Sequence, residues 1–182
     1  MLHTELLRVS VRAYNVLFLC TGNSARSILA ECIMNAIGKG TFHAFSAGSF
    51  PKGDVHPLAL RLLKEQGLDL EGLRSKSWNE FAAPGAPVMD FAFTVCDQAA
   101  GEVCPVWPGH PVTAHWGIAD PAAADGSGAD CMLAFREAFC MLERRIKLFL
   151  ALPLDSLDRM AIQRQVDAIG RFRPDTAEDR AS

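Results

Sequence analysis

The sequence predicts an α/β fold, in which a four-stranded parallel sheet carries helices on both faces as three layers, α/β/α. The first observation behind this prediction is that short apolar segments alternate along the chain with segments in which apolar residues recur at helical spacing. The second is that glycine or proline marks most boundaries between these segments. The third is size, because 182 residues, 49% of them hydrophobic, suffice for one compact core.

Four segments are predicted as strands. The first, residues 15–20, is a short, apolar and partly β-branched run that stops at a turn containing Gly22. Three further segments of the same kind are residues 41–47, 91–96 and 112–116. Nearly continuous apolar runs are typical of strands that are covered on both faces of a sheet.

Four segments are predicted as helices. Residues 27–37 carry an apolar stripe that ends before Gly38, and residues 57–66 begin with Pro57 and end before Gly67. The two remaining helices are marked by the stripe Phe135, Phe139, Leu142, Ile146 and Phe149, and by the stripe Ile162, Val166 and Ile169, which ends at Gly170. Because these helices alternate with the strands in the first half of the chain, a parallel sheet is expected.

The chain is expected to form one domain with a peripheral segment at each terminus. Residues 1–14 are predicted as an N-terminal extension, residues 15–170 as a single α/β domain, and residues 171–182 as a flexible C-terminal tail. Lys plus Arg number 18 and Asp plus Glu 21, which gives a net charge of −3 and favours neither a nucleic-acid nor an anionic-membrane partner.

The cellular compartment is predicted from the apolar runs and from the first residues of the chain. No apolar run reaches the roughly 18 residues that a membrane span needs, and the first ten residues carry charges where an export signal would be apolar. A cytoplasmic protein is therefore expected. The six cysteines would be kept reduced there, and we interpret their positions as chemistry rather than as a disulfide scaffold.

The first predicted strand leads into a segment that is typical of an oxyanion site. Ligands of open parallel sheets bind beyond the carboxyl ends of the strands, and a loop that enters a helix there turns backbone N–H groups toward a bound anion. Gly22 permits the tight turn. The predicted anion-binding residues are Thr21, Gly22, Asn23, Ser24, Ala25, Arg26 and Ser27, and they follow Cys20 directly.

Four side chains of this loop have predicted roles. Arg26 can bind two oxygens of one anion with its planar guanidinium, while Cys20 lies beneath the anion with its thiolate favoured by the same field. Ser27 can donate a hydrogen bond to the Cys20 sulfur, and Asn23 can hold the shape of the loop. The alternative is a buried cysteine at a strand end with an unrelated surface arginine. The strand before the loop and the helix after it favour a nucleophile in an anion site.

The anion loop and the segments around it resemble a known family. Residues 16–27, with 30–31 and 46–48, are similar to the low-molecular-weight protein tyrosine phosphatase superfamily, whose loop has the pattern Cys-x-Gly-Asn-x-Cys-Arg-Ser. The resemblance covers about residues 15–150 and implies its α/β fold. This chain departs from the pattern at Ala25, where many members have a second cysteine, and the departure concerns a protective disulfide in the loop and not the catalysis.

The resemblance also assigns residues outside the loop. It implies a general acid in an Asp-Pro pair late in the chain, and Asp120 is the candidate. His115 is expected to orient the loop that carries this acid. The resemblance further allows Glu31 to join Asn23 and Ser46 in a polar network below the anion loop.

Two branches of the superfamily share the loop, the phosphotyrosine phosphatases and the arsenate reductases. Phosphatases commonly hold the substrate ring with aromatic residues just after the Asp-Pro pair, where this chain has residues 122–126, without an aromatic residue. The pocket is therefore expected to suit a bare anion, although phenylalanines elsewhere in the chain could contribute to it. Cys96 and Cys104, with the segment 115–117, resemble the three-cysteine arsenate reductases.

That resemblance implies an arsenate reductase with a thiol–disulfide relay. Cys20 attacks arsenic, Cys96 attacks the adduct and releases arsenite, and Cys104 carries the disulfide to the surface. The implied substrate is arsenate or a phosphate-like oxyanion. No tightly bound cofactor is expected, and the implied reductant is thioredoxin, or glutaredoxin with glutathione.

Two other functions stay open at this point. One is a low-molecular-weight phosphatase or phosphomonoester hydrolase that uses Cys20, Arg26 and Asp120 without the relay. The other is a thiol-based arsenite or zinc sensor. Its candidate ligands are Cys96, Cys104, His110 and His115, although the gap between the two cysteines exceeds the usual zinc spacing, and no metal site is predicted.

The remaining cysteines and Trp116 are interpreted as structural or are left without a role. Cys32 lies on the apolar stripe of the first predicted helix, so we expect it in the core. Trp116 is expected to serve packing. Cys131 and Cys140 lie near the start and middle of the long helix and are assigned no role.

Overall fold

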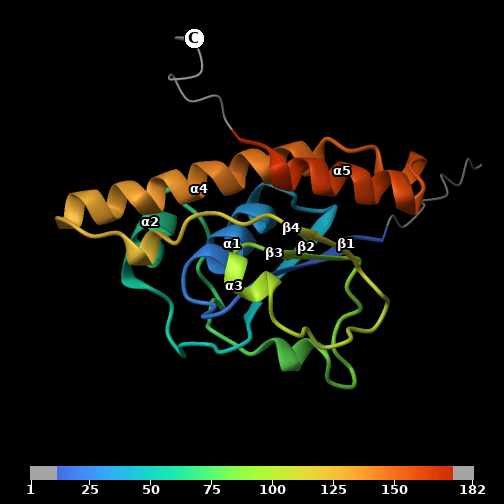
Figure 1. Ribbon diagram of the computed structural model, residues 1–182, viewed down its shortest axis with the longest axis horizontal. Helices are drawn as coiled ribbons and strands as arrows, with labels where there is room; N and C mark the ends of the chain where they lie inside the picture. Colours follow the sequence, from blue (N-terminus) through green and yellow to red (C-terminus); the bar gives the residue numbers. More distant parts are fainter. Residues whose placement is uncertain (1–11, 174–182) are drawn as a thin grey trace, which may run out of the picture.

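The computed structural model describes residues 12–173 and consists of one sheet with its helices (Figure 1). All strand pairs are parallel, and the order in the sheet is β2-β1-β3-β4. The strands are β1 (Tyr14–Cys20), β2 (Phe42–Gly48), β3 (Phe91–Thr94) and β4 (Val112–His115). The predicted four-stranded parallel sheet is confirmed. The register pairs Cys20 with Gly48 and Thr94 with His115, which brings the ends of all four strands to one edge of the sheet.

The predicted helices are present with small shifts at their ends, and several short helices join them. The α-helices are α1 (Arg26–Ile37), α2 (Pro57–Glu65), α3 (Asp97–Ala100), α4 (Gly128–Leu150) and α5 (Arg159–Arg171). The 3-10 helices are η1 (Trp78–Phe81), η2 (Pro121–Ala123) and η3 (Leu154–Ser156). The short helix α3 begins directly after residues 91–96, which is why strand β3 ends two residues earlier than its apolar pattern predicts.

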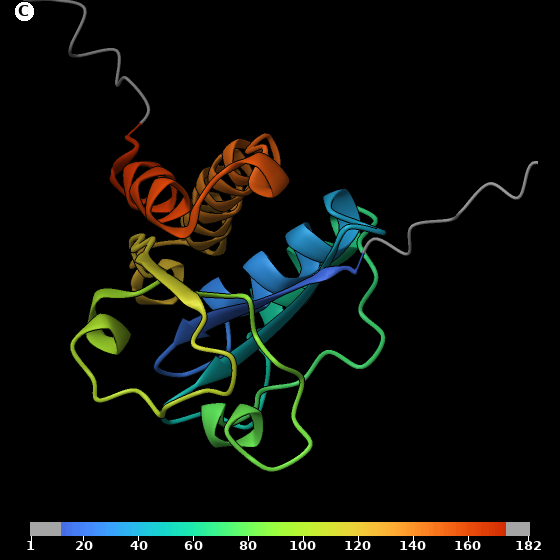
Figure 2. The same ribbon diagram turned by 90° about the vertical axis from the view of Figure 1, so that its right-hand side faces the viewer.

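The two faces of the sheet are covered differently (Figure 2). Phe18 and Phe93 belong to the main core, which the helices α1, α4 and α5 cover. Leu17 and Leu19, whose side chains alternate with these along the pleat, pack on the opposite face against η1 and loop residues. The helical layer on that face is thus thinner than predicted, since proline and glycine interrupt the segment 82–87 and leave only the 3-10 helix η1.

An aromatic cluster joins the sheet to α4 and α5. The rings of Phe93 and Trp116 stack with centroids 4.1 Å apart, and Phe149 of α4 packs edge-on against both. Trp116 is fully buried and donates its indole N–H to the carbonyl oxygen of Val166 at 3.0 Å. The expected packing role of Trp116 is confirmed.

Both edge strands form hydrogen bonds with helix side chains. On β2, the backbone N–H and C=O of Ala44 are bonded to the side-chain amide of Asn35 on α1, at 2.8 and 3.0 Å. On β4, the carbonyl oxygen of Thr113 accepts from Gln163 of α5 at 2.7 Å. The helices therefore cover the sheet and also occupy polar groups at its two edges.

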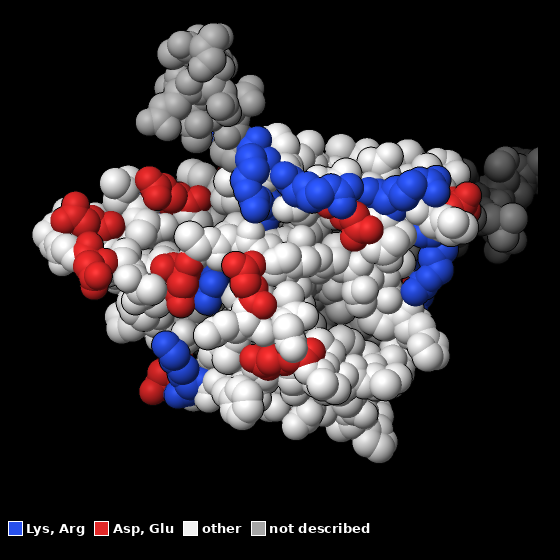
Figure 3. Space-filling model, in the orientation of Figure 1, with Lys and Arg blue, Asp and Glu red and all other residues white. Residues whose placement is uncertain are grey.

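One face of the described chain carries a basic stretch along α5 (Figure 3). Figure 3 shows lysine and arginine side chains gathered along α5, which contributes Arg159, Arg164 and Arg171. The sequence does not reveal this stretch because other residues separate the arginines. No helix within residues 12–173 is long and apolar enough to cross a membrane.

The predicted ends lie largely beyond the described part of the chain. Residues 1–11 of the N-terminal extension and 174–182 of the C-terminal tail are outside the described residues. Strand β1 begins at Tyr14, and α5 ends at Arg171. The domain boundaries 1–14, 15–170 and 171–182 stay predictions.

Helix α5 approaches the sheet through a glycine, and this contact yields a stability prediction. A Cβ atom on Gly170 would lie 2.2 Å from the carbonyl oxygen of His115, so we expect Gly170→Ala to destabilise the fold by about 1–3 kcal/mol. Urea unfolding measures the change. Gly128→Ala is the matched control, because nothing lies within 4 Å of its Cβ position at the start of α4. Equal stability of the two variants would contradict the packing described here.

Candidate active site

The segment from Cys20 to Ser27 forms a loop at the carboxyl edge of the sheet, between β1 and α1. Residues after β2 hold the outside of this loop by backbone hydrogen bonds. The N–H groups of Phe50, Lys52 and His56 donate to carbonyl oxygens of the loop at 2.9, 2.9 and 2.8 Å. Because these carbonyls are bonded from outside, the loop is fixed in shape by its neighbours.

The Cys20 thiol lies inside this loop and is 3% exposed. Its Sγ is 2.9 Å from Ser27 Oγ and accepts from the backbone N–H of Asn23 at 3.1 Å. Burial raises the pKa of Cys20, while the hydrogen bonds from Ser27 and Asn23 lower it. The expected stabilisation of the Cys20 thiolate is therefore present, but burial raises the pKa by more than the hydrogen bonds lower it.

Asn23 holds the loop from within. Its backbone has a φ of 41°, a left-handed conformation that few residues other than glycine adopt, and its side chain is fully buried. The amide nitrogen donates to Ser27 and Ser46 at 2.9 Å each, and the amide oxygen accepts from the backbone N–H of Lys76 at 2.8 Å. This one side chain joins the loop to β2 and to the segment before η1.

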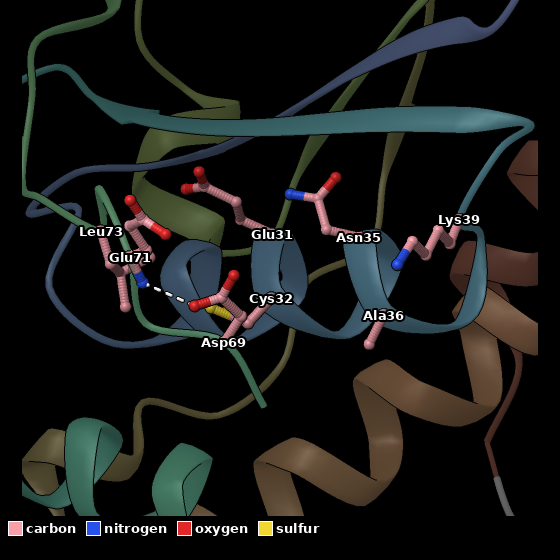
Figure 4. Close-up of a pocket in the computed structure, with 8 residues that line it drawn as sticks. All are labelled: Glu31, Cys32, Asn35, Ala36, Lys39, Asp69, Glu71 and Leu73. Carbon is pink, nitrogen blue, oxygen red and sulfur yellow. Dashed lines mark hydrogen bonds between the residues drawn. The ribbon is translucent and has the colours of Figure 1, made fainter. Parts of the chain in front are cut away.

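A polar network continues below the loop. Ser46 donates to the carboxylate of Glu31, and the Lys76 ammonium lies 3.5 Å from that carboxylate. Burial raises the pKa of Glu31, and the Lys76 charge acts against this increase. Figure 4 shows Glu31 at one side of a cavity of about 390 Å³ along α1. The contact of Glu31, Asn23 and Ser46 that the resemblance allowed is present.

Arg26 and Asp120 lie together above Cys20. The Arg26 guanidinium forms an ion pair with Asp120 at 3.1 Å and donates to the carbonyl oxygen of Ile118 at 3.2 Å. Asp120 is the N-cap of η2, and its other oxygen accepts from the backbone N–H of Ala122. Cys20, Arg26 and Asp120 line one cavity of about 170 Å³, so the structure brings the three predicted residues together.

The same cavity contains side chains that the sequence analysis did not assign. They are Phe50, Lys52 and Gln98. Phe50 is 74% exposed at the cavity, so an aromatic side chain is present even though residues 122–126 supply none. The signal that could have found Phe50 and Lys52 is their place just after β2, whose end lies beside the end of β1.

Cys96 lies close to the loop. It is 1% exposed, and its Sγ is 3.7 Å from the hydroxyl of Thr21, the residue next to Cys20. Cys96 is also the N-cap of α3, where its sulfur accepts from the backbone N–H of Ala99 at 3.4 Å. The structure therefore brings Cys20, at the end of β1, and Cys96, just after the end of β3, to the same edge of the sheet.

Cys104 lies elsewhere. It is half-buried against the second hydrophobic cluster and lines a different cavity, of about 520 Å³, together with Trp107. Burial raises the pKa of its thiol. The predicted second and third thiols are thus separated in this conformation by the turn of α3 and the loop after it.

The candidate zinc ligands do not gather. His115 bonds to Thr94 and Asp97 at 2.9 Å each, while Cys96 faces the anion loop. Within residues 12–173, no three His, Cys, Asp or Glu side chains come together as metal ligands. The contacts of His115 tie the last residue of β4 to the start of α3.

Comparison with known proteins places these features in a family. Residues 15–166 match the family described as low molecular weight phosphotyrosine protein phosphatase. An arsenate reductase of Halalkalibacterium halodurans is 35% identical over 134 residues, which are 74% of this chain and 93% of that protein. The chain belongs to this phosphatase family, in its arsenate reductase branch.

Solved structures of the family have the same fold. An arsenate reductase from Archaeoglobus fulgidus is 31% identical, with a TM-score of 0.58 over 75% of this chain and 99% of that chain. A thioredoxin-dependent arsenate reductase from Corynebacterium glutamicum is 24% identical, with a TM-score of 0.53 over 77% of this chain and 65% of that chain. The resemblance that the anion loop and its neighbours indicated is confirmed.

The other cysteines of this family member differ in burial. Cys32 lies in the core on α1, as predicted, and burial raises the pKa of its thiol to about 12. Cys131 donates to the carbonyl oxygen of Ala124, and Cys140 is exposed on α4. Cys140 is therefore a useful reference thiol for experiments on Cys20 and Cys96.

The hydrogen bond from Ser27 yields a prediction on the reactivity of Cys20. Since this bond lowers the pKa of the thiol, Ser27→Ala raises that pKa further and slows alkylation of Cys20 at neutral pH, where less thiolate is present. Mass spectrometry of the Cys20 and Cys140 peptides, across a range of pH with iodoacetamide, measures the change. Cys140 should react alike in both proteins, and an unshifted Cys20 profile would contradict the role of Ser27.

Proposed function

We propose that this protein reduces arsenate to arsenite, with Cys20 as the nucleophile and Cys96 as the thiol that resolves the adduct. The observation that carries the proposal is the position of Cys96, whose sulfur lies 3.7 Å from the hydroxyl of Thr21 beside the anion loop. Hydrolysis of a phosphate ester needs one thiol, whereas reduction of arsenic by two electrons needs a second. The arsenate reductases among the relatives support the same chemistry.

Arsenate binds in the cavity between the anion loop and Asp120. The backbone N–H groups of the loop and the N-terminus of α1 favour an anion there, and Arg26 offers two donors to its oxygens. An oxyanion competes with Asp120 for this guanidinium.

The first chemical step is a displacement at arsenic. The Cys20 thiolate attacks arsenic and forms an S–As bond, and the protonated Asp120 gives its proton to the departing oxygen, which leaves as water. Ser27 and the N–H of Asn23, both within hydrogen-bond distance of the sulfur, stabilise the thiolate before the attack. Arg26 neutralises charge on the remaining oxygens.

The second step reduces arsenic. The Cys96 thiolate attacks the sulfur of Cys20, the S–As bond breaks, and its electron pair stays on arsenic, which leaves as arsenite. The two thiols lose the two electrons that arsenic gains and become the disulfide Cys20–Cys96. Both sulfurs are buried next to the same loop residue, which supports this exchange over one with a surface cysteine.

The third step moves the disulfide outward. Cys104 attacks Cys96, so that Cys20 is released as a thiol and the disulfide Cys96–Cys104 lies nearer the surface. Because Cys104 packs against another cluster in the present conformation, this step requires α3 and the loop after it to rearrange. An external thiol reductant, thioredoxin or glutaredoxin with glutathione, then restores the reduced protein.

One observation favours a second activity of the same site. Phe50 lines the cavity and is largely exposed, so an aryl phosphate can place its ring beside this side chain while the phosphate occupies the loop. Arsenate and phosphate share geometry and charge, and water can resolve a thiophosphate at Cys20. This activity does not use Cys96, which separates it from the reduction of arsenate.

A single-turnover experiment tests the relay. Fully reduced protein receives excess arsenate without external thiol, arsenite is counted, and disulfides are mapped by mass spectrometry. We expect about one arsenite per chain from the wild type and from Cys140→Ser, the exposed-thiol control, and none from Cys96→Ser. Cys104→Ser should still give one arsenite and retain the Cys20–Cys96 disulfide. Wild-type yield from Cys96→Ser would refute the assignment.

Arg26 supplies a separate prediction. Arg26→Ala removes both donors to the bound oxyanion and should lower kcat/KM for arsenate by about 10²–10³-fold. Arg26→Lys keeps the charge but loses the planar pair of donors, so an intermediate loss is expected. Initial rates with an excess of coupled thiol reductant measure both. If the alanine variant kept wild-type efficiency, the anion site would have to lie elsewhere.

A further inference from the structure

Arg145 is a buried cation that the proposed chemistry does not use. It lies on α4 with 0% of its surface exposed, and no carboxylate within residues 12–173 forms an ion pair with it. Its Nε also has no hydrogen-bond partner in the described part of the chain. Burial lowers the pKa of this guanidinium to about 10, which leaves it charged at neutral pH. Burying an unpaired charge lowers the stability of the fold, so a function of this side chain would explain its presence.

Among the described residues, the guanidinium donates only to backbone carbonyls. Its Nη1 contacts the oxygens of Trp116 and Gly117 at 2.5 and 3.2 Å, and its Nη2 contacts the oxygen of Phe172 at 3.3 Å. Trp116 and Gly117 begin the segment that leaves β4 toward Asp120, and Phe172 follows the last residue of α5. Arg145 thus joins α4, the end of α5 and the start of the segment with the general acid.

The next carbonyl along this segment belongs to the anion site. The oxygen of Ile118 accepts from Arg26 at 3.2 Å, so two guanidinium groups hold three consecutive carbonyls, 116–118. Asp120 lies two residues further on and pairs with the same Arg26. The position of its carboxyl group therefore depends on how these carbonyls are held.

Packing alone fixes this segment on one side only. A Cβ atom on Gly117 would lie 2.5 Å from Asp97 Oδ1 and from His115 Nε2, so one side is in tight contact. The other side faces a cavity of about 650 Å³, which Ile118, Asp120 and residues of α4 line. The backbone N–H groups of Trp116 and Ile118 bond this segment to residues 94 and 95 at the end of β3. On the side of the cavity, the hydrogen bonds of Arg145 to the carbonyl oxygens of Trp116 and Gly117 add to these restraints.

We propose that Arg145 is a positioning residue for Asp120: by binding the carbonyl oxygens of Trp116 and Gly117, it holds the acid above Cys20 for proton transfer to the leaving oxygen. The inference rests on the proposed function, in which Asp120 is the general acid. It predicts that loss of Arg145 affects the protonation step more than anion binding. A displacement of a catalytic group by about 1 Å can lower a rate by roughly 10²-fold.

The test compares Arg145→Met, Arg145→Lys and Asp120→Asn in arsenate reduction with coupled thiol reductant, as kcat and KM from low to high pH. We expect Arg145→Met to lower kcat by about 10–100-fold with little change in KM. We also expect it to lose, as Asp120→Asn does, the decline of rate at high pH that a general acid causes. Arg145→Lys should recover part of kcat, because an ammonium can still donate to the two carbonyls.

Additional variants separate positioning from a loss of folding. Arg144→Met changes the exposed neighbour on α4 and should match the wild type. Adding Arg145→Met to Asp120→Asn should lower kcat by less than 3-fold, because the acid is already absent. Thermal unfolding identifies variants that do not fold. If Arg145→Met is one of them, the kinetics of Arg145→Lys are compared with those of the wild type instead.

Different failures point to different errors. No arsenite from the wild type would overturn the proposed function, and this inference with it. Wild-type kinetics of Asp120→Asn would leave reduction intact but remove the acid that Arg145 is meant to position. Two results would overturn the role of Arg145 alone. In the first, Asp120→Asn is impaired while Arg145→Met keeps the kcat and the pH profile of the wild type. In the second, the losses of the two single variants are fully additive in the double variant.

Discussion

The site depends on one side chain, Asn23, whose backbone is held in the left-handed region while its amide is fully buried. The three hydrogen bonds of that amide connect the anion loop to Ser46 on β2 and to Lys76 before η1. Without them, only the backbone hydrogen bonds from the residues after β2 would hold the loop in this strained conformation. The same bonds orient the Ser27 hydroxyl toward the sulfur of Cys20, so the geometry of the nucleophile and the shape of the loop have a common cause.

The parts of the structure that could be predicted are those that neighbouring residues specify. The strand, the loop from Cys20 to Ser27 and the helix after it are contiguous, and Asp120 was found because the family resemblance implies a general acid in an Asp-Pro pair. The site residues that were missed, such as Phe50, reach the cavity only through the pairing of β1 with β2. Arg145 was missed as well, since its acceptors are backbone carbonyls far from it in sequence, and such contacts leave no pattern in the chain.

The positions of Cys96 and Cys104 also differ in how far the sequence predicts them. The position of Cys96 at the end of the apolar run of the third strand predicted its presence beside Cys20, because strand ends of a parallel sheet meet at one edge. The position of Cys104 depends on a loop rich in glycine and proline, whose path no periodicity describes. In the structure this loop packs its cysteine against Trp107 and the second face of the sheet. The layer on that face, made of η1 and loops, differs from the predicted helical layer for a similar reason.

The helix side chains at the two edges of the sheet have a consequence for association between molecules. An edge strand with free N–H and C=O groups is a template on which another chain can add a strand, and this is a common route to aggregation. Asn35 occupies both backbone groups of Ala44 on β2, and Gln163 occupies the carbonyl of Thr113 on β4. At these positions, a strand from a second molecule would first have to displace a side-chain amide. The two side-chain amides thus help to prevent a strand of another molecule from pairing with either edge of the sheet.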